Sequence, residues 1–338
     1  MEALPPEALR SIRRRVLHWY RKNKRDLPWR RTRDPYRIWI SEIMLQQTRV
    51  AAVIPYYERF LARFPDVHAL ALANEQSLLA AWAGLGYYTR ARNLQKAAKK
   101  ILIELNAFPL DYPSIRDLPG VGDYTAAAIA SIAFNLPYAV LDGNVIRVLS
   151  RLTGESGNVD STVVRARLRV VADSLVDPRR PGEFNQGLME LGATVCLPKQ
   201  PQCLLCPLTV DCRALQSGRQ NELPVKSTRP GSTDVDVQLL VIEKANRILA
   251  WQRPAESRRL AGFWELPEPA QVPRATVESR IGQFSHTIVN TNYSYNVFRA
   301  SLVRVPSKFH WLSKDKLHEF PLSTAAKKAL ACLKKREG

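Results

Sequence analysis

The sequence lacks the features of a secreted or membrane-bound protein. No segment of the 338 residues approaches the ~18 consecutive apolar residues of a membrane-spanning helix. The N-terminal region has no charged start, apolar run and small-residue cleavage site, which argues against a signal peptide. Five cysteines in an intracellular chain of this length do not suggest a disulfide framework. We therefore expect a soluble, cytoplasmic protein with two or three domains.

Acidic residues are few relative to basic ones, since 31 Asp and Glu stand against 50 Lys and Arg and give a net charge of +19. The basic excess is present both before and after Asp236, so it does not come from a single tail. Each phosphate that a basic surface neutralises releases counterions, which favours a polyanionic partner. Nucleic acid is the natural interpretation, although a basic excess also occurs in proteins that are merely soluble.

The chain changes character near residue 216. Residues 6–215 show mostly helical periodicity, for example in residues 6–23, where Leu9, Ile12, Val16 and Trp19 share one face. The polar, Pro- and Gly-containing segment 217–234 is typical of a linker. Beyond it, β-branched and aromatic residues alternate as in strands, and residues 323–335 suggest a closing helix. We predict a helical region 1–216, a linker 217–234 and a small α+β domain 235–338.

The segment Leu118–Ala130, LPGVGDYTAAAIA, lies between two helical segments. Gly120 and Gly122 can adopt a positive φ and allow a close backbone approach. The N–H groups that open the next helix then form a site for a phosphate. Glycines at such a position also serve simply as helix caps, so the pattern alone leaves both interpretations open.

Four of the five cysteines, Cys196, Cys203, Cys206 and Cys212, are close together in the sequence. Structural zinc sites usually present two close pairs of cysteines, and only Cys203 and Cys206 form such a pair here. Four thiolates on one compact loop favour a [4Fe-4S] cluster, with zinc as the alternative. Cys332 is distant from them and is expected to be a core residue of the last helix.

These motifs together resemble the endonuclease III superfamily of helix-hairpin-helix DNA glycosylases. The segments LPWR (27–30), SEIMLQQTRV (41–50), WAGLGYYTRARNL (82–94) and NQGLMELGATVC (185–196) resemble its adenine-specific MutY branch. The resemblance implies base excision repair: hydrolysis of the N-glycosidic bond of adenine mispaired with 8-oxoguanine or guanine in double-stranded DNA. It also implies a [4Fe-4S] cluster, a monomer and a bacterial-type enzyme associated with the nucleoid.

Cleavage of this bond requires an acid for the leaving base and an ionised carboxylate for the sugar cation. Glu42 lies in an apolar helical stretch, where desolvation would raise the pKa of its carboxyl. Asp142 stands at a helix start, where the helix dipole would favour its charged form. From the residues alone, Glu42 could be exposed and Asp142 could be only an N-cap. The resemblance implies catalytic roles for Glu42 and Asp142, supported by Tyr124 and Asn144.

The resemblance also assigns residues that bind the base and the DNA. The adenine pocket would consist of Arg25, Trp29, Leu45, Gln186 and Met189. The extruded base leaves a gap in the duplex, into which Gln47 and Tyr87 would insert, although Tyr87 and Trp29 could also be core aromatics. Further DNA contacts are expected from Gln46, Thr48, Gly120, Val121 and Gly122.

The C-terminal domain resembles the Nudix-like domain of the same family. LAGFWELPE (260–268) matches part of a Nudix segment, but residues 269–280, PAQVPRATVESR, lack the acidic run that would hold magnesium. The domain is therefore expected to recognise rather than to catalyse. The loop FSHT (284–287) would read 8-oxoguanine, with Phe284 stacking and with Ser285 and His286 hydrogen-bonding. A polar loop without that function is the alternative.

Tyr124 predicts the reaction class. In bifunctional relatives the corresponding residue is a lysine whose amine forms a Schiff base with the sugar and leads to strand cleavage. A phenol has no route to that imine, so we expect hydrolysis by water that leaves an abasic site in an intact strand. The competing hypotheses are a glycosylase for G:T mismatches or oxidised pyrimidines, and a DNA-binding protein without catalysis.

Overall fold

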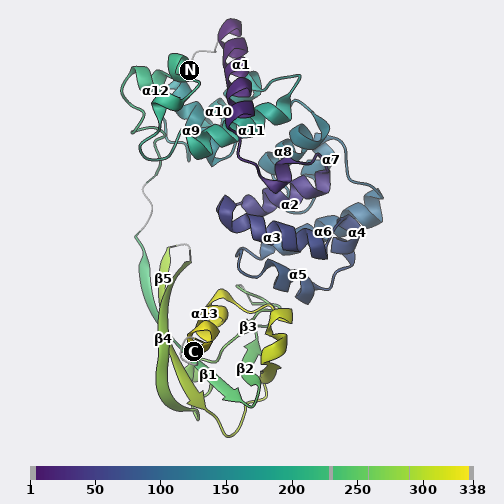
Figure 1. The fold of residues 1–338 in the computed structure, drawn as a ribbon, viewed down its shortest axis with the longest axis vertical. Helices are drawn as coiled ribbons and strands as arrows, with labels where there is room; N and C mark the ends of the chain where they lie inside the picture. The colour runs from purple at the N-terminus through teal and green to yellow at the C-terminus, as the bar shows by residue number, and fades with distance from the viewer. Residues whose placement is uncertain (1–4, 228–230, 258, 289, 335–338) are drawn as a thin grey trace. The chain divides into compact units, whose positions relative to one another are not determined.

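The computed structural model describes residues 5–227, 231–257, 259–288 and 290–334, and its chain forms two compact units (Figure 1). The first unit comprises Met1–Ala71 and Lys96–Thr228, and the second comprises Leu72–Gln95 and Arg229–Gly338. This division differs in two places from the boundaries predicted from the sequence, which were 1–216, 217–234 and 235–338. A segment from the helical region belongs to the second unit, and most of the expected linker belongs to the first.

The first unit is helical. Its short connecting turns include a 3-10 helix at Pro28–Arg30, a π-helical turn at Ile101–Leu105 and two 3-10 turns at Cys203–Leu205 and Thr209–Asp211. Helix α6 runs from one unit into the other, and α5 belongs to the second unit. In chain order, the α-helices up to residue 216 are α1 (Pro6–Asn23), α2 (Pro35–Leu45), α3 (Val50–Arg63), α4 (Val67–Leu72), α5 (Glu75–Trp82), α6 (Thr89–Lys100), α7 (Tyr112–Arg116), α8 (Asp123–Phe134), α9 (Gly143–Thr153), α10 (Thr162–Leu175), α11 (Pro181–Thr194) and α12 (Arg213–Gln216).

The periodicity of the sequence predicts α1 well, but it does not separate α2 from α3. In α1, Ile12, Val16 and Tyr20 are buried at helical spacing, as the periodicity indicates. The apolar pattern of 34–64 continues through a break that the structure places between Leu45 and Val50. Gln47 adopts a left-handed φ of 57° there, which no periodicity of side chains can reveal.

Helix α11 is the centre of the first unit and packs against α1, α8 and α9. Three glycines allow these helices to approach closely. A Cβ at Gly182 would lie 2.5 Å from the Ser131 carbonyl oxygen of α8, and one at Gly187 would lie 2.9 Å from Val16 of α1. A Cβ at Gly192 would lie 2.7 Å from Cβ of Asn144 in α9. The absence of a Cβ at these three positions therefore lets α11 pack closely against α1, α8 and α9.

The first part of the expected linker packs on the first unit. Leu223 is buried, and its carbonyl oxygen accepts a hydrogen bond from Arg151 Nε at 2.8 Å. The carbonyl oxygen of Val225 accepts one from the Val159 amide at 2.9 Å. A polar composition suggested a loose connection, but these backbone contacts fix the segment as far as residue 227.

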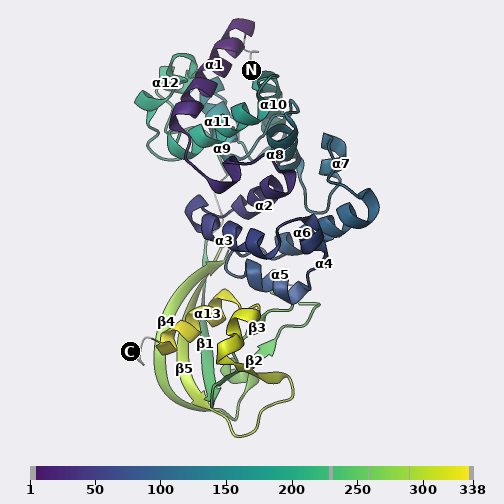
Figure 2. The ribbon, with the colours of Figure 1, turned by 45° about the vertical axis from the view of Figure 1, so that its right-hand side comes forward.

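The second unit is an α+β structure around a six-stranded sheet with the order β3-β2-β1-β5-β4, in which β6 also pairs with β2 (Figure 2). Strands β1 and β5 run parallel to each other, and the other strand pairs that the structure describes are antiparallel. Helix α13 (Thr324–Lys334) packs mainly against β4, and apolar residues of the sheet and of α13 form one core. The strands are β1 (Thr233–Lys244), β2 (Arg247–Gln252), β3 (Trp264–Glu265), β4 (Thr276–Ile288), β5 (Thr291–Ser301) and β6 (Phe309–Ser313).

The predicted closing helix is confirmed by α13, and Cys332 lies on it beside the core. Within the described part of the chain, no helix combines the length and the apolar character that crossing a membrane requires.

Candidate active site

A cavity of about 630 Å³ lies in the first unit, lined by α2, α8, α11 and the start of α9. It gathers residues that are far apart in the sequence, and most of the predicted catalytic and pocket residues are on its wall. The predicted residues that line it are Arg25, Trp29, Glu42, Leu45, Gln46, Gln47, Thr48, Tyr124, Asp142, Asn144, Gln186 and Met189.

Glu42 is buried in the second half of α2, with 5% of its surface exposed, so the exposed-helix interpretation is wrong. The Tyr124 hydroxyl donates a hydrogen bond to Glu42 Oε2 at 2.6 Å. Burial raises the pKa of the Glu42 carboxyl to about 7, helped by the charge of Asp142. The Tyr124 bond and the charge of Arg30 oppose this rise. Near neutral pH the site therefore contains a carboxyl that can hold a proton and release it.

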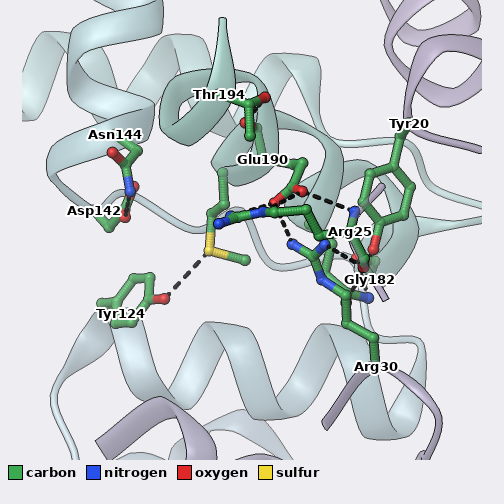
Figure 3. Close-up of polar contacts among 11 residues, drawn as sticks. Tyr20, Arg25, Arg30, Tyr124, Asp142, Asn144, Gly182, Glu190 and Thr194 are labelled. Atoms are coloured by element: carbon green, nitrogen blue, oxygen red, sulfur yellow. Dashed lines mark hydrogen bonds and ion pairs between the residues drawn. The ribbon is translucent and has the colours of Figure 1, made fainter. Parts of the chain in front are cut away.

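Tyr124 lies in the first turn of α8 and connects two walls of the cavity. Besides its bond to Glu42, its hydroxyl lies 3.2 Å from Met189 Sδ on α11 (Figure 3). Burial raises the pKa of the Tyr124 phenol well above its ordinary value, and the neighbouring carboxyls raise it further. The phenol is therefore neutral and acts as a hydrogen-bond donor.

Asp142 is the N-cap of α9, as its position in the sequence suggests. Its Oδ1 accepts from the Val145 amide at 2.7 Å, and its Oδ2 accepts from Asn144 Nδ2 at 2.9 Å. The helix start favours the charged form as expected, but its effect on the pKa of Asp142 is smaller than that of burial. Burial raises the pKa of Asp142 above its usual value, and the two hydrogen bonds only reduce that rise.

Arg147 was not identified from the sequence. Its Nη2 donates to Asn144 Oδ1 at 2.8 Å and to the Gly192 carbonyl at 2.7 Å, and its Nε donates to the Cys196 carbonyl at 2.7 Å. Arg147 thus connects the residue that holds Asp142 with the start of the cysteine loop. The sequence offered little signal for it, because Arg147 shares one polar side of α9 with Asn144, Ser150 and Arg151, the pattern of an ordinary surface helix.

Glu190 was also missed, although it lines the cavity. It stands in α11 beside Met189 and binds Arg25 and Arg30 (Figure 3). Burial alone would raise the pKa of Glu190, but the hydrogen bonds from Arg25 and Arg30 outweigh it and lower this pKa to about 2. The reasoning that singled out Glu42, a carboxyl within an apolar helical stretch, applies equally to Glu190.

The hairpin consists of α7, a turn and α8. Gly120 has a φ of 78°, whereas Gly122 has a φ of −94°. The expectation that both glycines use a positive φ therefore holds only for Gly120. A Cβ at Gly122 would meet no described atom within 4 Å, which leaves the N-terminus of α8 open. Arg116 and Asp123 form an exposed ion pair across this turn.

Two predicted DNA-contacting residues remain: Val121 is buried in the hairpin of the first unit, and Tyr87 belongs to the second unit. Tyr87 has a left-handed φ of 49° and is 52% exposed, so it is not a core aromatic. Trp29, in contrast, is buried beside Tyr57 and still lines the cavity.

The FSHT segment lies within β4 and not in a loop. Phe284 stacks on Tyr295 of β5 with ring centroids 4.8 Å apart, and Lys328 of α13 lies 5.5 Å from its ring. Ser285 is exposed and pairs with Ser294 in the sheet. Burial and the charge of Lys328 lower the pKa of His286, so its imidazole is more readily neutral.

The four cysteines of the loop provide a thiol donor set of the kind that holds an iron–sulfur cluster. The thiols lie within electrostatic range of one another, and burial with the neighbouring sulfurs raises the pKa of Cys206 to about 12. Arg151 is buried beside them, with Nη1 3.3 Å from Cys196 Sγ. Among the described residues, no three His, Cys, Asp or Glu side chains converge as ligands of a single metal ion. The donor chemistry and the adjacent cation fit an anionic cluster.

The chain is similar to known proteins of base excision repair. Residues 40–173 match the family of HhH-GPD superfamily base excision DNA repair proteins. The human adenine DNA glycosylase is 38% identical over 94% of this chain and 73% of its own length.

Two solved structures also resemble the chain. A thermostable thymine-DNA glycosylase is 30% identical with a TM-score of 0.57, and the match covers 62% of this chain and 97% of that one. An endonuclease III trapped covalently on DNA is 24% identical with a TM-score of 0.54, and the match covers 64% and 99%. This last likeness concerns the fold alone, and it extends over about two thirds of the chain.

Proposed function

The chain belongs to the adenine DNA glycosylases of the HhH-GPD superfamily, and we propose that it hydrolyses the N-glycosidic bond of adenine paired with 8-oxoguanine or guanine. The observation that carries this proposal is the pair of carboxyls, buried Glu42 of α2 and half-buried Asp142 at the start of α9, that line the same cavity. The cavity could accept a base that has left the duplex. The product would be an abasic site in an intact strand.

In this proposal Glu42 is the general acid. With a pKa near 7, its carboxyl can deliver a proton to N7 of adenine, directly or through water, which makes the base a better leaving group. Asp142 stabilises the positive charge that develops on the sugar. That charge would itself favour the ionised form of Asp142 and so oppose the rise in pKa that burial causes. Asn144 holds Asp142 in place.

The adenine pocket is proposed to consist of Arg25, Trp29, Leu45, Gln186 and Met189. Their common position on the cavity wall supports this assignment. For the DNA strand we propose contacts from the turn Gln46–Thr48 and from the hairpin residues 120–122, with Gln47 and Tyr87 filling the gap. The exposure of the Tyr87 side chain, at 52%, is compatible with insertion.

We further propose that Cys196, Cys203, Cys206 and Cys212 hold a [4Fe-4S] cluster, which would serve to hold the loop 196–212 in shape. Residues 235–338 would form a Nudix-like lesion-recognition domain. Its exposed Ser285 and half-buried His286 are candidates to hydrogen-bond to 8-oxoguanine. Phe284 already stacks on Tyr295, so it would stack on the lesion only if its ring moved or if the lesion used its remaining face.

The test of the activity is base release under single-turnover conditions from duplexes that contain 8-oxoG:A, G:A, G:T or thymine glycol. We expect adenine release from the first two and none from the others. Absence of adenine release would refute the proposal. Release of thymine from G:T would favour instead the activity named for the thermostable relative.

The test of the reaction class uses borohydride trapping on DNA with a preformed abasic site. The wild type should leave the strand intact, whereas Tyr124→Lys should form a trapped imine. Lys226 is the lysine on the cavity wall, so the experiment is repeated in a Lys226→Ala background to assign any background trapping. Trapping by the wild type that survives Lys226→Ala would contradict the monofunctional assignment.

A further inference from the structure

Glu190 is fixed in the cavity wall by burial and by several hydrogen bonds to its carboxylate. Its side chain has no exposed surface. Oε1 accepts hydrogen bonds from the Arg25 amide at 3.0 Å and from Arg25 Nε at 2.8 Å. Oε2 accepts from Arg25 Nη2 at 2.8 Å and from Arg30 Nη2 at 2.7 Å. Four donors from two arginines therefore converge on one carboxylate in the cavity wall (Figure 3).

Arg30 has little freedom beyond this carboxylate, whereas Arg25 is 39% exposed. Arg30 is only 10% exposed, its Nη1 donates to the Arg25 carbonyl at 3.2 Å, and its guanidinium lies 5.5 Å from the Tyr20 ring. The Tyr20 hydroxyl in turn donates to Gln186 Oε1 at 3.2 Å. Glu190 is thus the anchor of a cluster that ends at Gln186, one of the residues proposed to contact adenine.

The cluster also acts on Glu42 through its charge. Arg30 lowers the pKa of Glu42, in opposition to burial. Two cations and one anion leave the cluster with a net positive charge, and without Glu190 both guanidiniums would be uncompensated near the acid. The other titratable or charged groups on the cavity wall are Tyr124, Asp142, Arg147 and Lys226.

We propose that Glu190 is a positioning residue of the reaction: it fixes Arg25 and Arg30 in the cavity wall and offsets their charge, so that Glu42 retains the proton it donates. The inference rests on the proposed function, in which Glu42 is the acid. Glu190 does not contact the reacting atoms in this account. Its effect reaches the chemistry through Arg30 and, for the shape of the pocket, through Tyr20 and Gln186.

The experiment measures the single-turnover rate of adenine release from 8-oxoG:A duplex between pH 5 and pH 9. Activity requires protonated Glu42, so it should fall as the pH rises through the pKa of that carboxyl. In Glu190→Gln, the pH at which activity falls should move down by about one unit, because an unpaired cation favours the ionised carboxyl. In Arg30→Gln it should move up. The double variant should lie near the wild type, and Glu190→Asp should restore most of the wild-type profile.

Infrared difference spectroscopy against Glu42→Gln follows the Glu42 carboxyl directly, without DNA or turnover. If the wild type released no adenine, the proposed function would fail, and this titration would still decide whether Glu190 controls the protonation of Glu42. If Glu190→Gln does not fold, judged by its melting curve, Arg30→Gln and Glu190→Asp carry the test. A rate lowered equally at every pH, or a Glu42 titration unchanged in the folded variants, would overturn the proposal.

Discussion

Two buried glutamates line the same cavity, and their pKa values are shifted in opposite directions from that of an ordinary carboxyl. Glu42 receives a single hydrogen bond from a neutral phenol, and its pKa is about 7. Glu190 receives four hydrogen bonds from two arginines, and its pKa is about 2. Burial raises the pKa of both groups, so the partners decide the outcome. One cavity thereby contains a carboxyl that can exchange a proton and one that stays ionised.

The largest expected effect contrasts the two carboxyls in catalysis. Glu42→Gln removes the proton donor and should lower single-turnover adenine release by about 10²- to 10⁴-fold. Glu190→Gln makes the same replacement, a carboxylate by an amide, in the same cavity. It should lower adenine release far less at pH 6, where Glu42 still holds a proton. Binding of both variants to a duplex with a non-cleavable adenine analogue serves as the control. Equal losses would erase the distinction between an acid and a positioning residue.

The second contrast concerns stability. Removing one partner of a buried ion pair leaves uncompensated charge, which costs about 3–5 kcal/mol. We therefore expect Glu190→Gln to lower the free energy of unfolding at pH 7 by that amount, because Arg30 is nearly buried. Glu42→Gln, which replaces a carboxyl without a cationic partner, should not destabilise the protein. Urea unfolding of both variants measures the difference, and a stable Glu190→Gln would mean that the arginines find other partners.

The sequence could predict Glu42 because an acidic residue inside an apolar helical stretch is unusual and because the surrounding motif resembles a family. It could not predict the direction in which the pKa of Asp142 shifts. A helix start lowers the pKa of a carboxyl, burial raises it, and the sequence does not show how deeply the folded chain buries Asp142. Glu190 carried the same signal as Glu42 and lies in the motif 185–196, but the resemblance assigned no role to it there.

The fold shows a similar limit. Periodicity identified α1 and α13, since each places its apolar residues on one face. The break between α2 and α3 depends on the backbone of Gln47. The alternation of residues from Phe284 onward favours a strand, which pairing with β5 confirms, whereas the loop at FSHT came from the family resemblance and is wrong. The grouping of Leu72–Gln95 with the second unit depends on long-range contacts, which local sequence patterns do not contain.

The third contrast is in the pH dependence of stability. The pKa of Glu42 is about 7 in the folded protein against 4.5 for an unperturbed carboxyl, so the folded state binds more protons between these values. Its stability contribution is present below pH 4.5 and is lost as the pH rises towards 7, at a cost on the order of 3 kcal/mol. Glu42→Gln should therefore stabilise the protein at pH 8 relative to the wild type but not at pH 4.5.

Glu190 should show the reverse dependence. Its pKa of about 2 is below the unperturbed value, so its contribution is full above pH 4.5 and declines as the pH falls towards 2. The destabilisation by Glu190→Gln should accordingly shrink in acid. Thermal unfolding of the two variants across this range tests both signs, and parallel curves would show that the two carboxyls do not differ.

The smallest expected effect sharpens the account of Glu42 itself. The Tyr124 hydroxyl donates to Glu42 Oε2 and thereby lowers the pKa of the carboxyl, against the larger effect of burial. Tyr124→Phe removes this one bond, worth about 1 kcal/mol, and leaves the ring in place. The pH at which adenine release falls should then rise by less than about one unit, opposite in sign to the shift in Glu190→Gln. A downward shift would mean that the phenol stabilises the protonated form of Glu42. Tyr124→Phe and Glu190→Gln would then shift the pKa of Glu42 in the same direction, which contradicts the proposed difference between Tyr124 and Glu190.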